Sequence, residues 1–160
     1  MYSLFLIIHS WLRWGALIAG LLAVFMLVTR QQPPGSSSPA TSPSDRWGLL
    51  FLIAMDLQLV VGLLLYFVVS PNMAAIRANF AEAMTTRSTR FWAVEHVTIM
   101  LAGVLALHLG RALARKARTP DSRRRRLLIG MAIALIAIIG GTPWPGTVTG
   151  RPLLRISGQS

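Results

Sequence analysis

The sequence predicts an all-α integral membrane protein, a four-helix bundle with both termini on the non-cytoplasmic side. The chain has 160 residues, of which 54% are hydrophobic, and its mean hydropathy of +0.58 is extreme for a soluble domain of this size. Its apolar residues form runs close to the 20 residues that an α-helix needs to cross a bilayer. Its basic residues, which give a net charge of +11, lie mainly between these runs. That distribution favours a membrane protein over a nucleic-acid-binding one.

Four segments are expected to span the membrane, at about 4–28, 47–69, 91–113 and 127–143. The fourth is short in apolar residues, and we expect its Gly/Pro-rich end to reach the interface. The first could be mistaken for a signal peptide, but it has no basic start and contains His9 and Arg13, so we expect a retained helix. We see no internal repeat and expect one domain over residues 1–160.

The orientation follows from the positive charges of the loops. Ten Lys and Arg residues lie in the loops that join the first span to the second and the third to the fourth, and five lie on the other side. Because basic loops stay in the cytoplasm, both termini are expected outside it. For a bacterial chain this means the inner membrane with periplasmic termini. The Arg123–Arg126 run is expected to fix this topology and to contact anionic lipids.

Two histidines fall at matching positions near the outer face. His9 follows Ser3 by six residues and His96 follows Arg90 by six, on spans that run in the same direction. With a rise of about 1.5 Å per residue, the two imidazoles are expected at similar depth. Small and apolar residues continue each stripe below its histidine, which allows another group to approach closely. These residues are Ala16, Gly20, Ala23 and Leu27 on the first span, and Met100, Gly103, Leu107 and Gly110 on the third.

Two neutral imidazoles on two helices are the ligands that a b-type haem requires. The chain has no cysteine, which excludes covalent c-type haem, Cys-ligated iron–sulfur clusters and thiolate zinc sites. We therefore expect a single bis-His haem. A structural polar cluster, a copper site and a quinone pocket remain the alternatives.

Four further residues are predicted to support this cofactor. Arg13 and Arg90 are candidates for pairing with the haem propionates. Glu95 is expected to orient a histidine or to pair with Arg13. Tyr66 is expected at the same level, where it would bind a propionate or Glu95, or belong to an aromatic belt.

The other polar residues of the spans lie nearer the cytoplasmic side. His108 follows His96 by twelve residues, about 18 Å deeper, so the two cannot share an iron. Asp56 is an intramembrane carboxylate and a candidate functional group by default. We interpret both as a possible quinone or proton site, or as structural. A contact between them is expected to need a tilt or a water, because their depths differ by about five residues.

Several motifs together resemble a family of small four-helix bacterial membrane proteins labelled cytochrome b-like. They are "HSWLRW", "DLQLVVGLLLY", "RFWAVEH", "HLGR", "TPWP" and "RPLLR", and they cover nearly the whole chain. The resemblance implies haem-linked electron transfer, with His9 and His96 as the axial ligands. The two-haem b561-type proteins need four histidines, whereas this chain has three.

Three functions remain open from the sequence. The first is a b-type haem protein that passes electrons from quinol to a periplasmic partner. The second is a non-catalytic small subunit of a larger respiratory or photosynthetic complex, and the third is a metal- or quinone-handling membrane protein. The expected partners are membrane lipids and a larger membrane complex or further copies of the chain, and not nucleic acid.

Overall fold

A computed structural model describes residues 1–29 and 43–152. All regular structure within those residues is helical. Three helical segments are long and apolar enough to cross a membrane, Tyr2–Thr29, Asp45–Val69 and Arg87–Arg115. The all-α prediction is therefore confirmed for the described residues, and the membrane character that the composition indicated is supported by these three segments.

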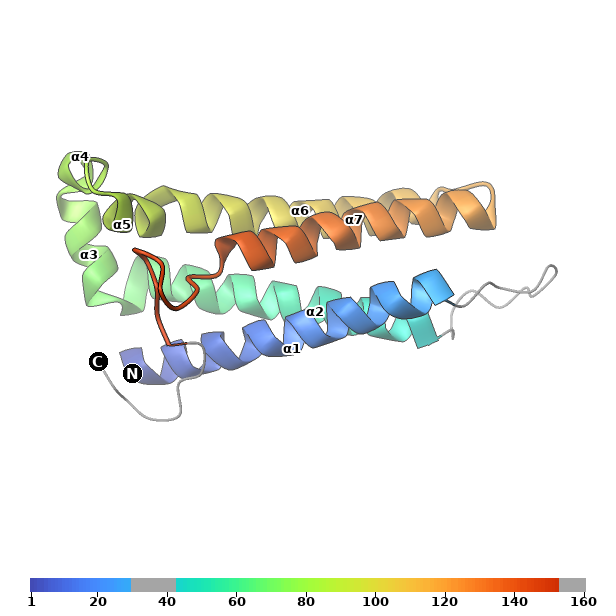
Figure 1. The fold of residues 1–160 in the computed structure, drawn as a ribbon, viewed down its shortest axis with the longest axis horizontal. Coiled ribbons are helices and arrows are strands. Elements are labelled where there is room, and N and C mark those ends of the chain that lie inside the picture. The colour runs from blue at the N-terminus through green and yellow to red at the C-terminus, as the bar shows by residue number, and fades with distance from the viewer. Residues whose placement is uncertain (30–42, 153–160) are drawn as a thin grey trace.

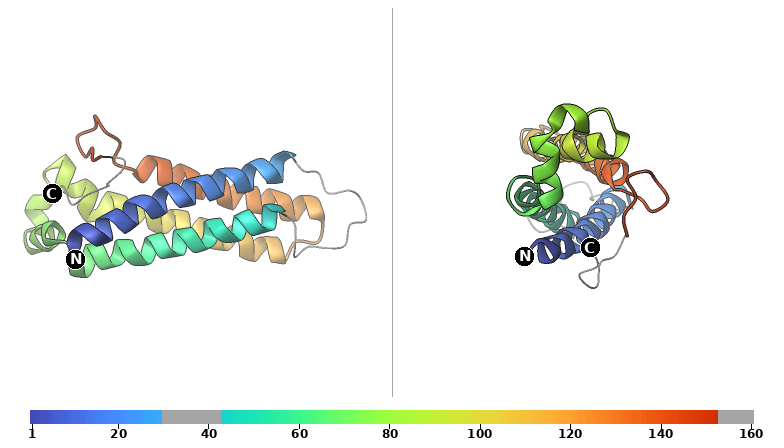
Figure 2. Two further views of the ribbon diagram at one scale, coloured as in Figure 1. Left: turned by 90° about the horizontal axis from the view of Figure 1, so that it is seen from below. Right: turned by 90° about the vertical axis from the view of Figure 1, so that its left-hand side faces the viewer.

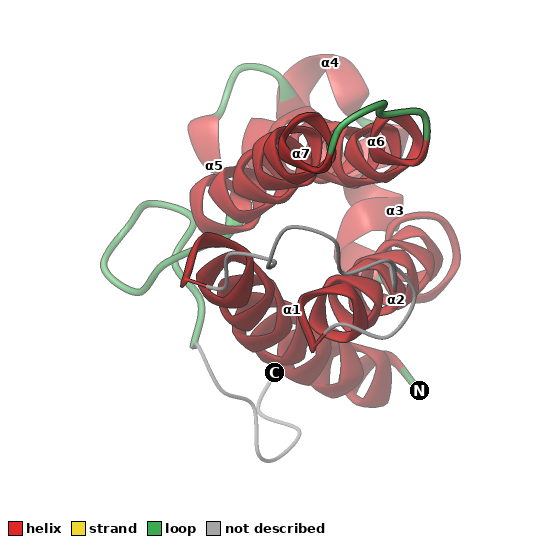
Figure 3. Cartoon of the chain, turned by 90° about the vertical axis from the view of Figure 1, so that its right-hand side faces the viewer, coloured by secondary structure: helices red, strands yellow, loops and turns green. Residues whose placement is uncertain are grey.

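Two antiparallel helix pairs run side by side along the structure. α1 (Tyr2–Thr29) packs along α2 (Pro43–Leu64), and α6 (His96–Arg115) packs along α7 (Pro120–Gly141). The pairs meet where α1 contacts α7 and where α2 contacts α6. In Figure 1 the α6–α7 pair lies above the α1–α2 pair, and viewed end-on α1 and α6 therefore lie at opposite corners (Figure 3). Of the predicted limits, the start of the fourth differs most, because α7 begins at Pro120 rather than near residue 127.

Small residues let the helices approach closely at the core. On α1 the predicted stripe of Ala16, Gly20 and Ala23 is buried, as expected from the sequence. A Cβ atom added to Gly20 would lie 2.8 Å from Leu135 Cδ2 and 3.0 Å from Phe51 Cε2. Larger side chains from α2 and α7 thus fill the space that the small residues of α1 leave, a packing mode typical of membrane helices.

The contact between α6 and α7 is closer still, because glycine faces glycine. A Cβ atom added to Gly110 would lie 2.9 Å from Gly130 Cα. One at Gly103 would lie 2.7 Å from Ala137 Cβ. Both glycines belong to the buried stripe predicted for the third span, so the backbones of this pair approach without intervening side chains.

Two π-helical turns interrupt the regular helices at the same end of the structure. η1 (Leu65–Val69) continues α2, and η2 (Phe91–Glu95) leads directly into α6 at His96. We call this end the histidine end. A π turn inserts one extra residue into the helix and rotates the residues beyond it, and such turns occur frequently at functional sites.

Short helices close the histidine end. α3 (Pro71–Ala78), α4 (Phe80–Ala83) and α5 (Arg87–Arg90) lie across it (Figure 2). The Ser70 hydroxyl caps α3 by accepting a hydrogen bond from the Met73 amide. Arg77 donates hydrogen bonds to the carbonyl oxygens of Tyr66 and Phe67, which anchors α3 to the end of the preceding helix.

Arginines hold the opposite end of the structure together. We call it the arginine end and define it by Arg123–Arg126 at the start of α7. Arg123 pairs with Asp45 at 2.7 Å, and Arg126 donates to the Leu113 carbonyl oxygen of α6 at 2.7 Å. Arg124 donates to the Leu27 and Val28 carbonyl oxygens at the end of α1. This run therefore ties α7 to the other three long helices, in addition to the topological role expected from the sequence.

Candidate functional site

A cavity opens between the two helix pairs at the histidine end. Its polar lining includes His9 and Arg13 from α1, Gln58 from α2 and His96 from α6. Its walls are largely apolar and come from the same helices and α7; they include Met55, Leu59, Met100, Val104 and Ile138. A few polar groups converging on an apolar cavity are typical of a small-molecule or cofactor site.

His9 and His96 both line this cavity and lie close together, although they come from helices at opposite corners of the structure. Their ring centroids are 6.3 Å apart and their planes are inclined by 64°. A metal–imidazole bond is about 2 Å long, and the ring centre lies about 1 Å beyond the bonded nitrogen. Two imidazoles on opposite sides of one iron would therefore have centroids about 6 Å apart. The observed separation fits a shared iron.

One ring nitrogen of His96 is fixed by a backbone hydrogen bond. Its Nδ1 lies 2.8 Å from the Gly141 carbonyl oxygen at the end of α7. Since a carbonyl only accepts, Nδ1 carries the hydrogen and Nε2 keeps its lone pair. A metal-bound histidine ordinarily donates its other ring N–H to such an acceptor.

His9 packs against α2 where a glycine leaves room for its ring. A Cβ atom on Gly62 would lie 3.2 Å from His9 Cε1. His9 Nδ1 is buried and has no hydrogen-bond partner in the described part of the chain, and the same holds for Gln58 Oε1. Gln58 lies one helical turn before Gly62, so it presents an acceptor on the face of α2 that His9 contacts. Unsatisfied buried polar atoms are uncommon and point to a missing ligand or to a partner reached by a small rearrangement.

Two arginines of the cavity wall lie close to tryptophans. The guanidinium carbon of Arg13 is 5.7 Å from the centre of the Trp14 ring. That of Arg151 lies 4.5 Å from the Trp92 ring, within the range of a cation–π interaction. Sequence reasoning placed Arg13 here but missed Arg151 and Gln58. Arg151 comes from the segment after α7, whose path no periodicity predicts, and a lone glutamine within an apolar span gives no signal of the cavity that it lines.

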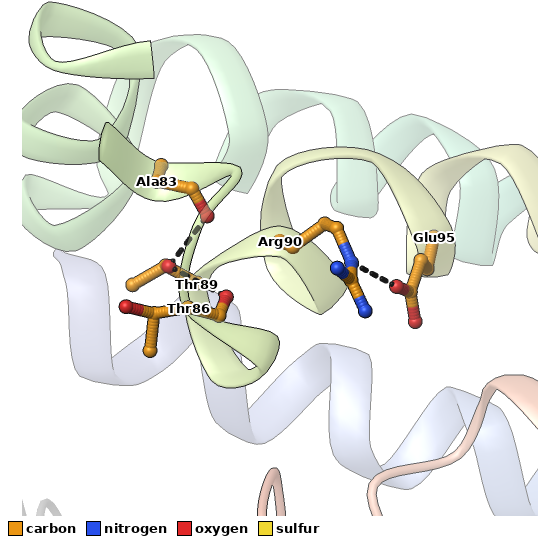
Figure 4. A network of polar contacts seen from close by, with 5 residues as sticks. All are labelled: Ala83, Thr86, Thr89, Arg90 and Glu95. Carbon is orange, nitrogen blue, oxygen red and sulfur yellow. Dashed lines mark hydrogen bonds and ion pairs between the residues drawn. The ribbon is translucent and has the colours of Figure 1, made fainter. Parts of the chain in front are cut away.

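The structure places Arg90 and Glu95 differently from the prediction. Their side chains pair with each other, Arg90 Nε to Glu95 Oε1 at 2.8 Å (Figure 4). Both are partly exposed and lie outside the cavity lining. Glu95 therefore bonds neither to Arg13 nor to a histidine, which were its predicted partners. The reason is the π turn at 91–95: its wider turn brings residues five apart onto one face of the helix.

Tyr66 lines the cavity, but its hydroxyl is already engaged. It donates to the Ala93 carbonyl oxygen at 2.8 Å, which joins η1 directly to η2. The predicted alternatives were a propionate, Glu95 or an aromatic belt, and none of them anticipated this link. Its effect is to fix the two π turns relative to each other just before His96.

Asp56 and His108 contact each other away from the cavity. His108 Nε2 lies 2.8 Å from Asp56 Oδ1, and both side chains are nearly half exposed. The predicted depth difference of about five residues does not separate them, because α2 and α6 pack in contact and bring the two side chains level without an intervening water. As predicted, His108 does not join His96.

Within residues 1–29 and 43–152, no group of three or more His, Asp or Glu side chains is arranged to hold a metal ion. Haem differs from a bare metal ion in this respect, because the porphyrin supplies four of the iron ligands and the protein needs to supply only one or two. Comparisons with protein families, with curated proteins and with solved structures found no match to the chain. The assignment of this site therefore depends on its own geometry.

Proposed function

We propose that the chain is a b-type haem protein of the bacterial inner membrane. Its four long helices cross the bilayer, both termini are periplasmic, and one haem lies between the helix pairs. The observation that carries this proposal is the 6.3 Å separation of the His9 and His96 rings in the lining of an apolar cavity.

Each polar residue of the cavity has a separate role in holding the cofactor. His9 and His96 would hold the haem iron through their ring nitrogens, and the Gly141 carbonyl oxygen keeps His96 in the tautomer that presents Nε2. Gln58 Oε1 is available as the acceptor for the N–H of His9. Arg13 and Arg151 place positive charge beside the cavity, where propionates would be neutralised.

Bound there, haem supplies reversible one-electron transfer. The protein contributes apolar walls that exclude water and two ligands of the same kind, which together set the redox potential. The histidine end opens toward the periplasmic side in the proposed topology, so a periplasmic partner would approach it there. A quinol dissolved in the bilayer is the proposed electron donor, in keeping with the resemblance to cytochrome b-like proteins.

A redox difference spectrum of the purified protein tests the proposal. We expect a dithionite-reduced α-band from the wild type and its loss in His9→Ala and in His96→Ala. His108→Ala is the matched control, because it removes a histidine from the same helix as His96 but outside the cavity. A wild type without haem, or full haem in both cavity variants, would reject the proposal in favour of the small-subunit function with a structural polar cluster.

A further inference from the structure

The Asp56–His108 pair lies on the outside of the structure, at the seam between α2 and α6. Its side chains are 44% and 49% exposed. Both residues belong to segments able to span a membrane, and they lie well inside those segments. Ionisable groups within a bilayer normally face protein or water, because hydrocarbon solvates them poorly. In the proposed topology this pair must therefore be covered by a polar partner, because lipid hydrocarbon cannot solvate it.

Half of the pair's hydrogen-bonding capacity is unused. His108 Nε2 and Asp56 Oδ1 bond to each other. Neither His108 Nδ1 nor Asp56 Oδ2 bonds to any other described residue. In a bilayer each polar atom needs a partner within protein. A suitable cover must bring a hydrogen-bond donor and an acceptor to the same depth, side by side.

We propose that this face binds a second copy of the chain, in a dimer with its two-fold axis along the membrane normal. Rotation about that axis sets α2 of one protomer opposite α6 of the other. Because Asp56 and His108 are in contact, they lie at one depth, and the rotation preserves depth. Each carboxylate then meets His108 of the partner subunit, and each imidazole meets Asp56 of the partner subunit. The face carries both members of the hydrogen-bonded pair and is thus complementary to itself, as a two-fold interface must be.

The apolar surroundings of the pair suit such an interface. Exposed aliphatic side chains from both helices flank it above and below, so two faces could interlock around a polar centre. Those side chains are Ile53, Leu57 and Val60 on α2, and Leu101, Leu105 and Leu109 on α6. This proposal does not depend on haem: the pair lies on the outer face, away from the cavity.

Cysteine cross-linking in lipid vesicles tests the dimer, and the cysteine-free chain makes every introduced thiol unique. Leu105→Cys places the thiol on the proposed interface. Ile136→Cys is the control on α7. Ile136 is at least as exposed as Leu105, and the contact of Gly103 with the neighbouring Ala137 puts it at a similar depth. Because α6 of one protomer lies opposite α2 of the other, two equivalent thiols on α6 lie diagonally across the interface, so a bis-maleimide with a flexible spacer joins them where a direct disulfide would not. We expect this reagent to give about tenfold more covalent dimer from Leu105→Cys than from Ile136→Cys, since an interface raises the effective concentration of thiols.

A second comparison tests whether the Asp56–His108 pair holds the dimer together. Adding Asp56→Leu and His108→Leu to the Leu105→Cys chain leaves a wholly apolar face, and we expect its cross-linking to fall to the level of Ile136→Cys. Equal cross-linking of the two single-cysteine chains would overturn the proposal, and so would unchanged cross-linking after the pair is removed. A monomeric Leu105→Cys chain whose thiol is protected from a thiol reagent by added quinone would also overturn the proposal, and would assign the face to a lipid-soluble ligand.

Discussion

Replacing Arg124 with alanine removes the two hydrogen bonds that close the carboxyl end of α1. The guanidinium donates from Nε to the Leu27 carbonyl oxygen at 2.8 Å, and from a terminal nitrogen to that of Val28 at 2.9 Å. A hydrogen bond to a charged group contributes about 1.5–3 kcal/mol when shielded and less when exposed. The second of these bonds is exposed. A cation at a helix carboxyl end adds about 0.3–1 kcal/mol.

We therefore expect Arg124→Ala to lower the free energy of unfolding by about 2 kcal/mol. For a chain of this size each kcal/mol corresponds to about 2–4 °C, so the apparent Tm should fall by about 4–8 °C. Circular dichroism at 222 nm during heating in a fixed detergent measures this change. Tryptophan fluorescence provides a second probe, because Trp47 packs against the core near the same end.

Arg125→Ala is the matched control for this prediction. It removes the same charge from the same arginine run, but its side chain is exposed, and we expect its Tm to stay within about 1 °C of the wild type. Equal losses in the two variants would refute the capping argument. They would show that the run acts only through total charge, as in lipid binding.

Two further predictions concern the cofactor and the topology. Gln58→Leu should retain haem but raise its reduction potential by a few tens of millivolts in a redox titration. The reason is that His9 loses the hydrogen-bond acceptor that makes its imidazole a stronger ligand for ferric iron. An unchanged potential in a haem-loaded variant would show that Gln58 does not contact His9. A reporter fused after the last residue should be active when it requires the periplasm and inactive when it requires the cytoplasm; the reverse pattern would contradict the proposed orientation.

The sequence allowed the long apolar helices and their buried faces to be predicted, because both depend on local spacing. The stripe of Ala16, Gly20 and Ala23 is buried as its periodicity of 3.6 indicated. The pairing of His9 with His96 was also anticipated, since helices of similar length that run in the same direction place equivalent positions at equal depth. The structure brings those rings to 6.3 Å.

Tertiary structure alone decided the partners of the other polar side chains. The π turn at 91–95 places Glu95 beside Arg90, because an inserted residue changes which positions share a face. The Tyr66 hydroxyl bonds to the Ala93 carbonyl oxygen of a different element. Composition cannot reveal such an insertion, since the same residues also fit an ordinary α-helix.

The contacts that the sequence could not predict are mainly those between elements distant along the chain. Arg124 reaches α1 across 97 residues, and Asp56 reaches His108 across 52. A single sequence carries the depth of each residue within its own helix, but not the rotation and lateral placement of one helix against another. Those are set by how small and large side chains interlock over the whole interface, which is a property of the packed structure and not of any one segment.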